Sequence, residues 1–296
     1  MSGPVKGIDT RAVALTAIAM VAFAANSLLC RLALGRDLID PASFATVRVA
    51  SGALALLLIM LARRHTRNEG GAGWRSALML FTYMAFFAFA YRSLATGTGA
   101  LILFGAVQLT MFVFALRKGE HFSLVSWAGL ALAVCGLVYL VLPGVSAPDP
   151  LGAALMAIAG AAWGVYSLLG KGAADPLSAT ARNFLYAVPL MLIVSVLSLH
   201  DLNVSTGGLA LAITSGAVTS GCGYVVWYAA VPRLTASRAA VVQLSVPIIA
   251  AFGGVVVLSE HVTVRLLIAS AATLGGVAIV LAQRAAKPVP AQAAAR

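Results

Sequence analysis

Long apolar blocks occupy most of this chain, and short polar segments separate them. Each block is long enough to cross the ~30 Å hydrocarbon core of a bilayer as a helix, because a helix rises about 1.5 Å per residue. We expect ten such helices, over residues 12–33, 43–62, 74–93, 98–116, 124–142, 151–170, 178–199, 208–230, 238–258 and 264–283. The pattern therefore predicts an all-α polytopic membrane protein.

The second half of this pattern repeats the first. Glu120-His121 follows the fourth predicted helix, and Glu260-His261 follows the ninth, 140 positions later. Residues 27–31 align with residues 167–171 at the same offset. Five helices per half is an odd number, so the second half must enter the membrane from the opposite face. We expect two inverted five-helix repeats, residues 1–145 and 146–284, followed by a disordered tail at 285–296.

Composition and charge agree with a membrane protein and give its orientation. The chain is 61% hydrophobic and 10% charged, and its net charge is +11. Lysine and arginine concentrate in alternate loops, at residues 6–11, 63–75, 117–118, 171, 233–238 and 284–296. Basic residues favour the cytoplasmic side, so both termini are expected in the cytoplasm of a bacterial cell, with the protein in its inner membrane. Loop charge explains the basic balance without a nucleic-acid partner.

Neutral polar and aromatic side chains interrupt the predicted helices. In hydrocarbon they need partners, so they face protein or a water-filled cavity. The candidates for binding a substrate are Asn26, Tyr83, Gln108, Trp163, Tyr166, Tyr224 and Gln243. For the glutamines the alternative is an interhelical hydrogen bond, and for the aromatic residues it is anchoring at the membrane interface. Pro247 predicts a helix break, because it cannot donate to the carbonyl of Gln243.

Charged side chains are almost excluded from the predicted helices. All nine acidic residues and all four histidines lie in loops or at helix ends, whereas Arg48 and Arg182 lie inside helices at matched positions of the two halves. Snorkelling to the interface is the preferred interpretation of both arginines. The alternative is that one or both face the pathway and meet a carboxylate of the substrate. Because proton carriers keep an ionisable group within the membrane, the sequence favours facilitative transport.

Motifs of enzyme chemistry are missing from the sequence. It contains no HExxH, GxSxG or P-loop pattern, and its three cysteines have no CxxC spacing. We therefore expect no catalytic residues, no metal site and no cofactor. Small residues such as Gly160, Gly164, Gly216 and Gly275-Gly276 predict close helix packing instead.

The two inverted halves, each with a glutamate after its fourth helix and a glycine-rich fifth helix, resemble the drug/metabolite transporter superfamily of the EamA type. Residues 236–283 carry the strongest similarity. Within that superfamily the chain is most similar to ten-helix bacterial exporters of amino acids, aromatic ones included. The resemblance implies a basket of ten helices, alternating access and a central cavity. The chain departs from the family where Val107 stands opposite Pro247, since the family often has proline at both positions.

These observations lead to one main hypothesis and two alternatives. The main hypothesis is an inner-membrane exporter of amino acids or similar small metabolites. Gln108 and Gln243 would hold polar groups of the substrate, and the aromatic candidates would wall its apolar part. An exporter of drugs or organic cations with the same fold is the first alternative, and a membrane scaffold or receptor is the second. The expected partners are a small-molecule substrate and the lipid bilayer, for a monomer or a homodimer.

Overall fold

The computed structural model describes residues 10–63, 73–170, 173–234 and 236–286. Seven helices follow one another in the first two thirds of the chain: α1 (Thr10–Leu34), α2 (Pro41–Ala62), α3 (Trp74–Tyr91), α4 (Thr96–Arg117), α5 (Leu124–Val141), α6 (Pro150–Leu169) and α7 (Pro176–Leu197). Each of them coincides, within a few residues, with one predicted span. The predicted tail at 285–296 lies almost wholly outside the described residues.

The last three spans are less regular. The eighth contains α8 (Thr206–Ile213), the π-helix η2 (Thr214–Cys222), α9 (Gly223–Ala230) and the short turn η3 (Val231–Arg233), and it follows the short turn η1 (Leu199–Asp201). The ninth is divided into α10 (Ala236–Gln243) and α11 (Ser245–Leu258), and the tenth is α12 (Val264–Ala286). Nine segments of the described chain are long and apolar enough to cross a membrane. With α3, which carries Arg75 and two tyrosines, the all-α polytopic prediction of ten helices is confirmed.

Aspartate-proline pairs begin three of the helices. In α2, α6 and α7 the proline is the first helical residue, where its missing N–H is not needed. The preceding aspartate caps the helix by accepting a hydrogen bond from a backbone N–H in the first turn. The donors are Ser43 for Asp40, Gly152 for Asp149 and Ser178 for Asp175, at 2.9, 2.6 and 3.2 Å. These local signals fix where the helices start.

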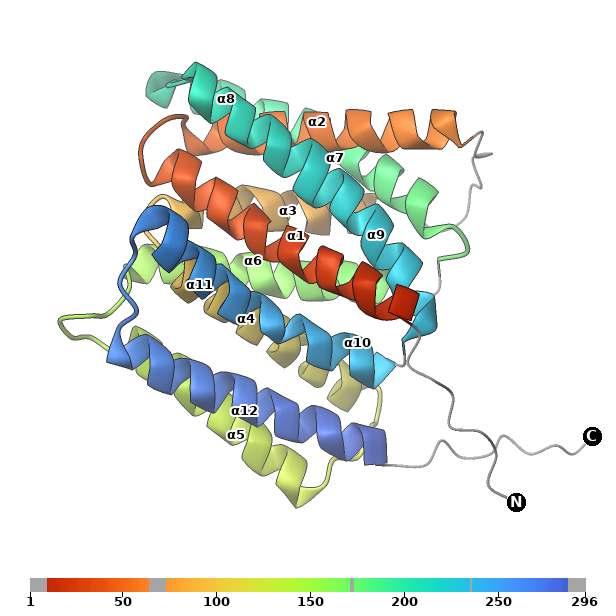
Figure 1. The fold of residues 1–296 in the computed structure, drawn as a ribbon, viewed down its shortest axis with the longest axis vertical. Coiled ribbons are helices and arrows are strands. Elements are labelled where there is room, and N and C mark those ends of the chain that lie inside the picture. Colours follow the sequence, from red (N-terminus) through yellow and green to blue (C-terminus); the bar gives the residue numbers. More distant parts are fainter. Residues whose placement is uncertain (1–9, 64–72, 171–172, 235, 287–296) are drawn as a thin grey trace, which may run out of the picture.

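Helices of one half pack mainly on helices of the other half (Figure 1). The helix α5 lies along α12, α2 lies along α7, and α4 crosses α11. The helix α6 packs on α3 and α4, just as α1 packs on α9 and α11. Each contact in the first half thus has a counterpart in the second, as an inverted repeat requires. The interior between the halves is where a shared site can form.

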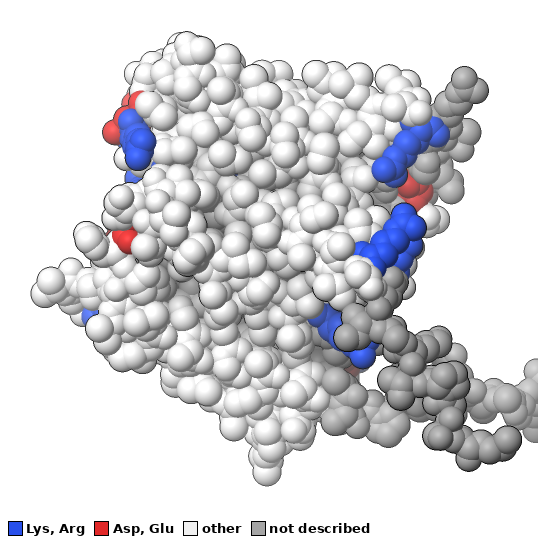
Figure 2. Space-filling model, viewed as in Figure 1, with Lys and Arg blue, Asp and Glu red and all other residues white. Residues whose placement is uncertain are grey.

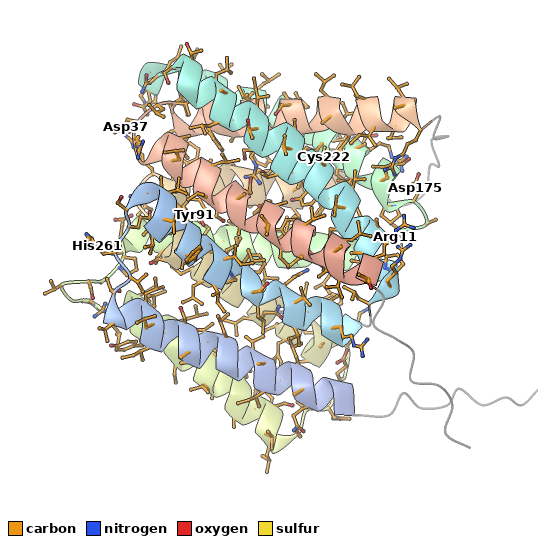
Figure 3. The ribbon with its side chains drawn as sticks, in the orientation of Figure 1. Arg11, Asp37, Tyr91, Asp175, Cys222 and His261 are labelled. Carbon is orange, nitrogen blue, oxygen red and sulfur yellow. The ribbon has the colours of Figure 1, made fainter. Side chains whose placement is uncertain are left out.

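Charged residues gather at two ends of the helix bundle. On the face drawn in Figure 2, a belt without charged side chains separates them. Asp37 and His261 lie at one end, and Arg11 and Asp175 lie at the other (Figure 3). Large apolar side chains are exposed between the ends, such as Ile248 at 61% and Phe252 at 69%. Such a belt suits lipid. Following the predicted orientation, we call the end with Asp37 the outer end and the end with Arg11 the inner end.

Glycines let backbones approach closely where the helices cross. A Cβ atom at Gly160 of α6 would lie 2.5 Å from the carbonyl oxygen of Leu103 in α4. A Cβ atom at Gly216 of η2 would collide with the carbonyl oxygen of Arg48 and with the hydroxyl of Ser51, both in α2. Small residues at such crossings replace the hydrophobic driving force that helices lack inside lipid. The packing of α2 against η2 therefore depends on Gly216.

We expect Gly216→Ala to destabilise the protein. The new methyl group meets backbone atoms of α2, which cannot rotate away, so the helices must separate, at a cost of about 1–3 kcal/mol. Gly275→Ala in α12 is the matched control, because nothing lies within 4 Å of its Cβ position. Thermal unfolding of both purified variants in detergent measures the difference. An equal loss of stability in both variants would contradict the packing argument.

Candidate functional site

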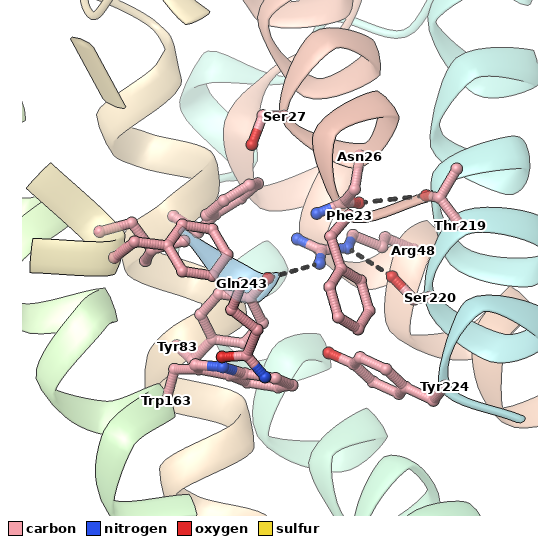
Figure 4. Close-up of a pocket in the computed structure, with 13 residues that line it drawn as sticks. Phe23, Asn26, Ser27, Arg48, Tyr83, Trp163, Thr219, Ser220, Tyr224 and Gln243 are labelled. Atoms are coloured by element: carbon pink, nitrogen blue, oxygen red, sulfur yellow. Dashed lines mark hydrogen bonds between the residues drawn. The ribbon is translucent and has the colours of Figure 1, made fainter. Parts of the chain in front are cut away.

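A narrow cavity lies between the two halves (Figure 4). Seven spans contribute to its lining, which consists of Phe23, Asn26 and Ser27 of α1, Arg48 of α2, Tyr83 and Phe87 of α3, Leu103 and Phe104 of α4, Trp163 of α6, Thr219, Ser220 and Tyr224 of the eighth span, and Gln243 of α10. The cavity has a volume of about 30 Å³. This volume holds about one or two water molecules, so a larger solute needs movement of the lining side chains.

A helix interruption brings Gln243 to the cavity. The helix α10 ends at Gln243, and α11 begins at Ser245. Around the interruption, the Leu244 N–H donates to the Val241 carbonyl at 3.0 Å, and the Ser245 hydroxyl donates to the Val242 carbonyl at 2.7 Å. Pro247 is buried in the first turn of α11 and has no N–H to offer the Gln243 carbonyl. The helix α4 of the first half has valine at the matching position and is continuous.

The π-helix η2 supplies hydroxyl groups to α1 at the cavity wall. Ser215 donates to Asn26 Oδ1 at 2.7 Å, and the Thr219 hydroxyl lies 3.3 Å from the same oxygen. Because the amide oxygen is held by hydroxyls, the amide nitrogen of Asn26 is free to point away from η2, as Figure 4 shows. A π-helix widens the turn and is found often at functional sites. Here it places the hydroxyls of Ser215 and Thr219 toward Asn26 of α1 and the hydroxyl of Ser220 toward Arg48 of α2.

Arg48 lies in the centre of the molecule and not at the membrane interface. Its side chain is 1% exposed. Its Nε donates to the Ser220 hydroxyl at 3.3 Å, and Nη2 donates to the Tyr83 hydroxyl at 3.1 Å. The guanidinium also lies over the ring of Phe87, 4.9 Å from its centroid. The preferred snorkelling interpretation is therefore wrong for Arg48, because hydroxyls and ring faces inside the protein replace interfacial water.

Aromatic rings form the opposite wall of the cavity. Trp163 stacks on Tyr224 with 5.4 Å between ring centroids, and it lies 4.9 Å from Tyr83. Phe23 meets Tyr224 edge to face at 5.9 Å. Tyr166 contacts Trp163 at 5.4 Å, but it stands behind the lining and accepts a hydrogen bond from Asn183. The wall is thus broad, apolar and fixed by mutual ring contacts.

The structure brings together most of the residues predicted for the site. Five of them line the cavity: Asn26, Tyr83, Trp163, Tyr224 and Gln243. Tyr166 lies directly behind Trp163, whereas Gln108 is half-buried on α4 outside the lining. Arg182 is half-buried on α7 and also lies outside it. Sequence reasoning did not identify Phe23, Ser27, Thr219 and Ser220, since apolar and small residues occur throughout such helices.

An ion pair joins four helices just beyond the cavity, toward the outer end. Arg31 Nε lies 3.2 Å from Glu260 Oε1, and Nη1 of Arg31 donates to the carbonyls of Tyr91 and Arg92 at the end of α3. The second oxygen of Glu260 accepts the Thr96 N–H, which begins α4, at 2.9 Å. Arg31 and Tyr91 each follow a lining residue of the same helix by one turn. We call Arg31, Tyr91, Thr96 and Glu260 the outer network, and it lies beyond Ser27 and Phe87 on the outer side of the cavity.

Comparisons with known proteins give a consistent result. The model of a family described as the EamA-like transporter family matches the chain twice, at residues 10–142 and 150–282. A Pseudomonas aeruginosa protein named "Uncharacterized protein PA1977" is 48% identical over 276 residues, which are 93% of this chain and 96% of that protein. An "Uncharacterized transporter" of Archaeoglobus fulgidus is 26% identical over 285 residues, covering 91% and 97% of the two chains.

A solved structure has the same fold. One crystal structure superimposes with a TM-score of 0.64, covering 90% of this chain and 98% of that chain. The two sequences are 19% identical, so this similarity concerns the fold alone.

We expect Glu260→Gln to loosen the outer end of the cavity. The amide keeps the shape of the side chain but loses the charge that pairs with Arg31, at a cost of about 1 kcal/mol for a partly exposed pair. Cys30 is fully buried next to Arg31, whereas Cys135 and Cys222 are exposed and can be replaced by alanine. Maleimide labelling of Cys30 should then become about fivefold faster.

Asp201→Asn serves as the control for that measurement. Asp201 is an exposed acid in the loop between α7 and α8, and it pairs with His200 at 3.1 Å. Its amide variant should label at the original rate. Equal labelling rates in the Glu260→Gln variant and the parent would show that the outer network does not hold this end closed.

Proposed function

The chain belongs to the EamA-like transporter family, and we propose that it exports amino acids or similar small metabolites, aromatic ones included, across the bacterial inner membrane. Family members are transporters, and the chain is a multi-pass membrane protein of this kind. The observation that carries the finer proposal is the cavity between the halves, with one aromatic wall and several fixed polar groups. A cavity of this composition suits an organic solute that has an apolar body and a polar end.

Alternating access is the mechanism that the arrangement supports. The lining comes from both halves, so rocking of one half against the other would expose the cavity first on one side and then on the other. The outer network would have to open when the solute leaves. Its counterpart in the repeat consists of Glu120 at the inner end and Lys171, which lies outside the described residues. The basic loops at the inner end support the orientation with both termini in the cytoplasm.

The proposed substrate contacts follow from the lining. Trp163 and Tyr224 present stacked ring faces, which favour an aromatic or branched apolar side chain. Gln243 and Asn26 present amide groups to the same space. Because Gln243 is the end of an interrupted helix, its position would change when α10 and α11 change their relative orientation. We propose that this residue couples solute binding to the movement.

The lining also bears on the energy source. Arg48 is the one charged side chain among its described residues, and arginine remains protonated in proteins. A proton carrier needs a group that gains and loses its proton near the solute. We therefore propose movement of the solute down its own gradient. The same positive charge disfavours an organic cation as substrate, because two like charges would share an enclosed, weakly polarisable space.

Flux measured with purified protein in proteoliposomes tests this function. Labelled phenylalanine, tryptophan and leucine should enter the vesicles faster than in protein-free controls, at rates that do not depend on an imposed pH gradient. A strict requirement for the gradient would overturn the facilitative mechanism. Absence of flux for every amino acid would overturn the proposed substrate class, and transport of organic cations instead would support the alternative exporter.

The two glutamines provide a matched pair of variants. Gln243→Ala removes one half-buried hydrogen-bonding group from the lining, so transport should fall several-fold, as expected for about 1 kcal/mol. Gln108→Ala removes the same group from the other half at a position outside the lining, and its flux should match the parent. Initial rates at equal reconstituted protein measure both. A loss confined to Gln108→Ala would place the site elsewhere on α4.

A further inference from the structure

Building on the proposed function, we propose that Arg48 binds the carboxylate of the transported solute. The site then selects organic monocarboxylates with an apolar or aromatic body, and an amino group on the solute is not required. This statement narrows the substrate class of the cavity and identifies the group that recognises it.

The first observation is an unused donor at the cavity. A guanidinium has five N–H donors, and it has no acceptor. In Arg48, Nε is used by Ser220 and Nη2 by Tyr83, whereas Nη1 is buried and finds no acceptor among the residues that the structure describes. Buried polar groups of native proteins are nearly always hydrogen-bonded. Arg48 lines the cavity, so an acceptor carried by a solute can fill this position.

The second observation is the uncompensated charge. The described lining residues include no aspartate or glutamate, so the protein itself does not neutralise Arg48 within the cavity. The acidic side chain of the outer network, Glu260, is already paired with Arg31. Burying a cation without an anion is costly, and the cost falls when a carboxylate binds with hydrogen bonds. A solute carboxylate would supply the missing negative charge.

The third observation is the rigid placement of the guanidinium. Tyr83 and Ser220 hold two of its nitrogens, and the ring of Phe87 covers its face. Gly216 keeps the backbone of α2 at Arg48 directly against η2. The group is therefore oriented before a solute arrives, which lowers the entropic cost of binding. Figure 4 places Trp163 and Tyr224 across the cavity from Arg48, where they would receive the apolar body of the same solute.

The cavity interacts differently with the carboxylate and with the ammonium group of an amino acid. The carboxylate has a fixed cationic donor, but an ammonium group next to Arg48 would be repelled, and the described lining offers only neutral hydroxyls, amides and ring faces to offset the repulsion. A monoanion leaves the occupied cavity neutral, whereas a zwitterion leaves it with one positive charge. We therefore expect 3-phenylpropanoate to bind more tightly than phenylalanine, and phenethylamine, which lacks the carboxylate, to bind least.

The test uses the full-length protein and these three compounds. In proteoliposomes, unlabelled 3-phenylpropanoate should inhibit uptake of labelled phenylalanine at lower concentration than phenylalanine itself, and phenethylamine should not inhibit. Direct flux of labelled 3-phenylpropanoate should fall about tenfold or more in Arg48→Gln, since a charge-assisted hydrogen bond is lost, and part of it should return in Arg48→Lys. Arg182→Gln, the repeat counterpart outside the lining, is the matched control and should keep the flux.

A second measurement covers the possibility that Arg48→Gln does not fold. Tyr83→Phe keeps the charge and the ring but removes the hydroxyl that fixes Nη2, so the preference for 3-phenylpropanoate over phenylalanine should shrink. Thermal unfolding of the parent protein in detergent measures binding separately from transport. We expect 3-phenylpropanoate to raise the unfolding temperature and phenethylamine to leave it unchanged. Equal inhibition by the acid and the amine, or an unchanged acid preference in Arg48→Gln, would overturn the role of Arg48.

The outcomes separate this inference from the proposed function. Transport of phenylalanine with no preference for the acid, and with no effect of Arg48→Gln, overturns the carboxylate site and leaves the exporter proposal standing. Lack of flux for all three compounds, together with lack of stabilisation by any of them, overturns both. Transport of 3-phenylpropanoate with exclusion of phenylalanine supports the carboxylate site and corrects the exporter proposal toward organic acids.

Discussion

A guanidinium cannot lose its charge inside an apolar bundle, and the elements around Arg48 are arranged to meet this constraint. The helix α3 contributes Tyr83 and Phe87, and η2 contributes Ser220. The close approach of α2 to η2 at Gly216 brings Ser220 within reach of Arg48. Three spans from both halves thus meet at one side chain. In lipid, where helices gain little from excluding water, such a polar contact contributes strongly to how they associate.

The two halves share an architecture but differ at the cavity. The first half contributes uninterrupted helices, with Asn26 on α1 and Arg48 on α2. The second half contributes the irregular backbone, with a π-helix in its eighth span and the interruption before Pro247 in its ninth. Irregular backbone at membrane depth is tolerated where it borders a cavity or is buried in protein. The hydroxyls of η2 satisfy polar groups of the first half, so the asymmetry is part of the site.

Much of this molecule can be predicted from its sequence, and the failures have physical causes. Apolar run length determines the spans, so the predicted helix boundaries agree with the observed ones within a few residues. Trp163, Tyr224 and Gln243 stand out because their polarity or size is unusual at mid-span. The position of a residue along a predicted helix does not show which face of the helix carries its side chain. Gln108 and Gln243 therefore look equivalent in the sequence, although Gln243 lines the cavity and Gln108 lies outside the lining. For the same reason, the sequence does not show that the side chain of Arg48 points into the protein.

The dominance of contacts between halves has a consequence for biosynthesis. The ribosome completes α1 and α2 long before it reaches residues 215–220. In the folded protein, Ser220 accepts a hydrogen bond from Arg48 Nε, and Ser215 donates one to Asn26 Oδ1. Until those residues are made, both polar side chains need temporary hydrogen-bond partners, such as water in the insertion channel or at the membrane surface. Assembly of the first half is therefore completed only after translation of the eighth span. A separately expressed first half would carry these unsatisfied groups with it, so each half acts as the folding partner of the other.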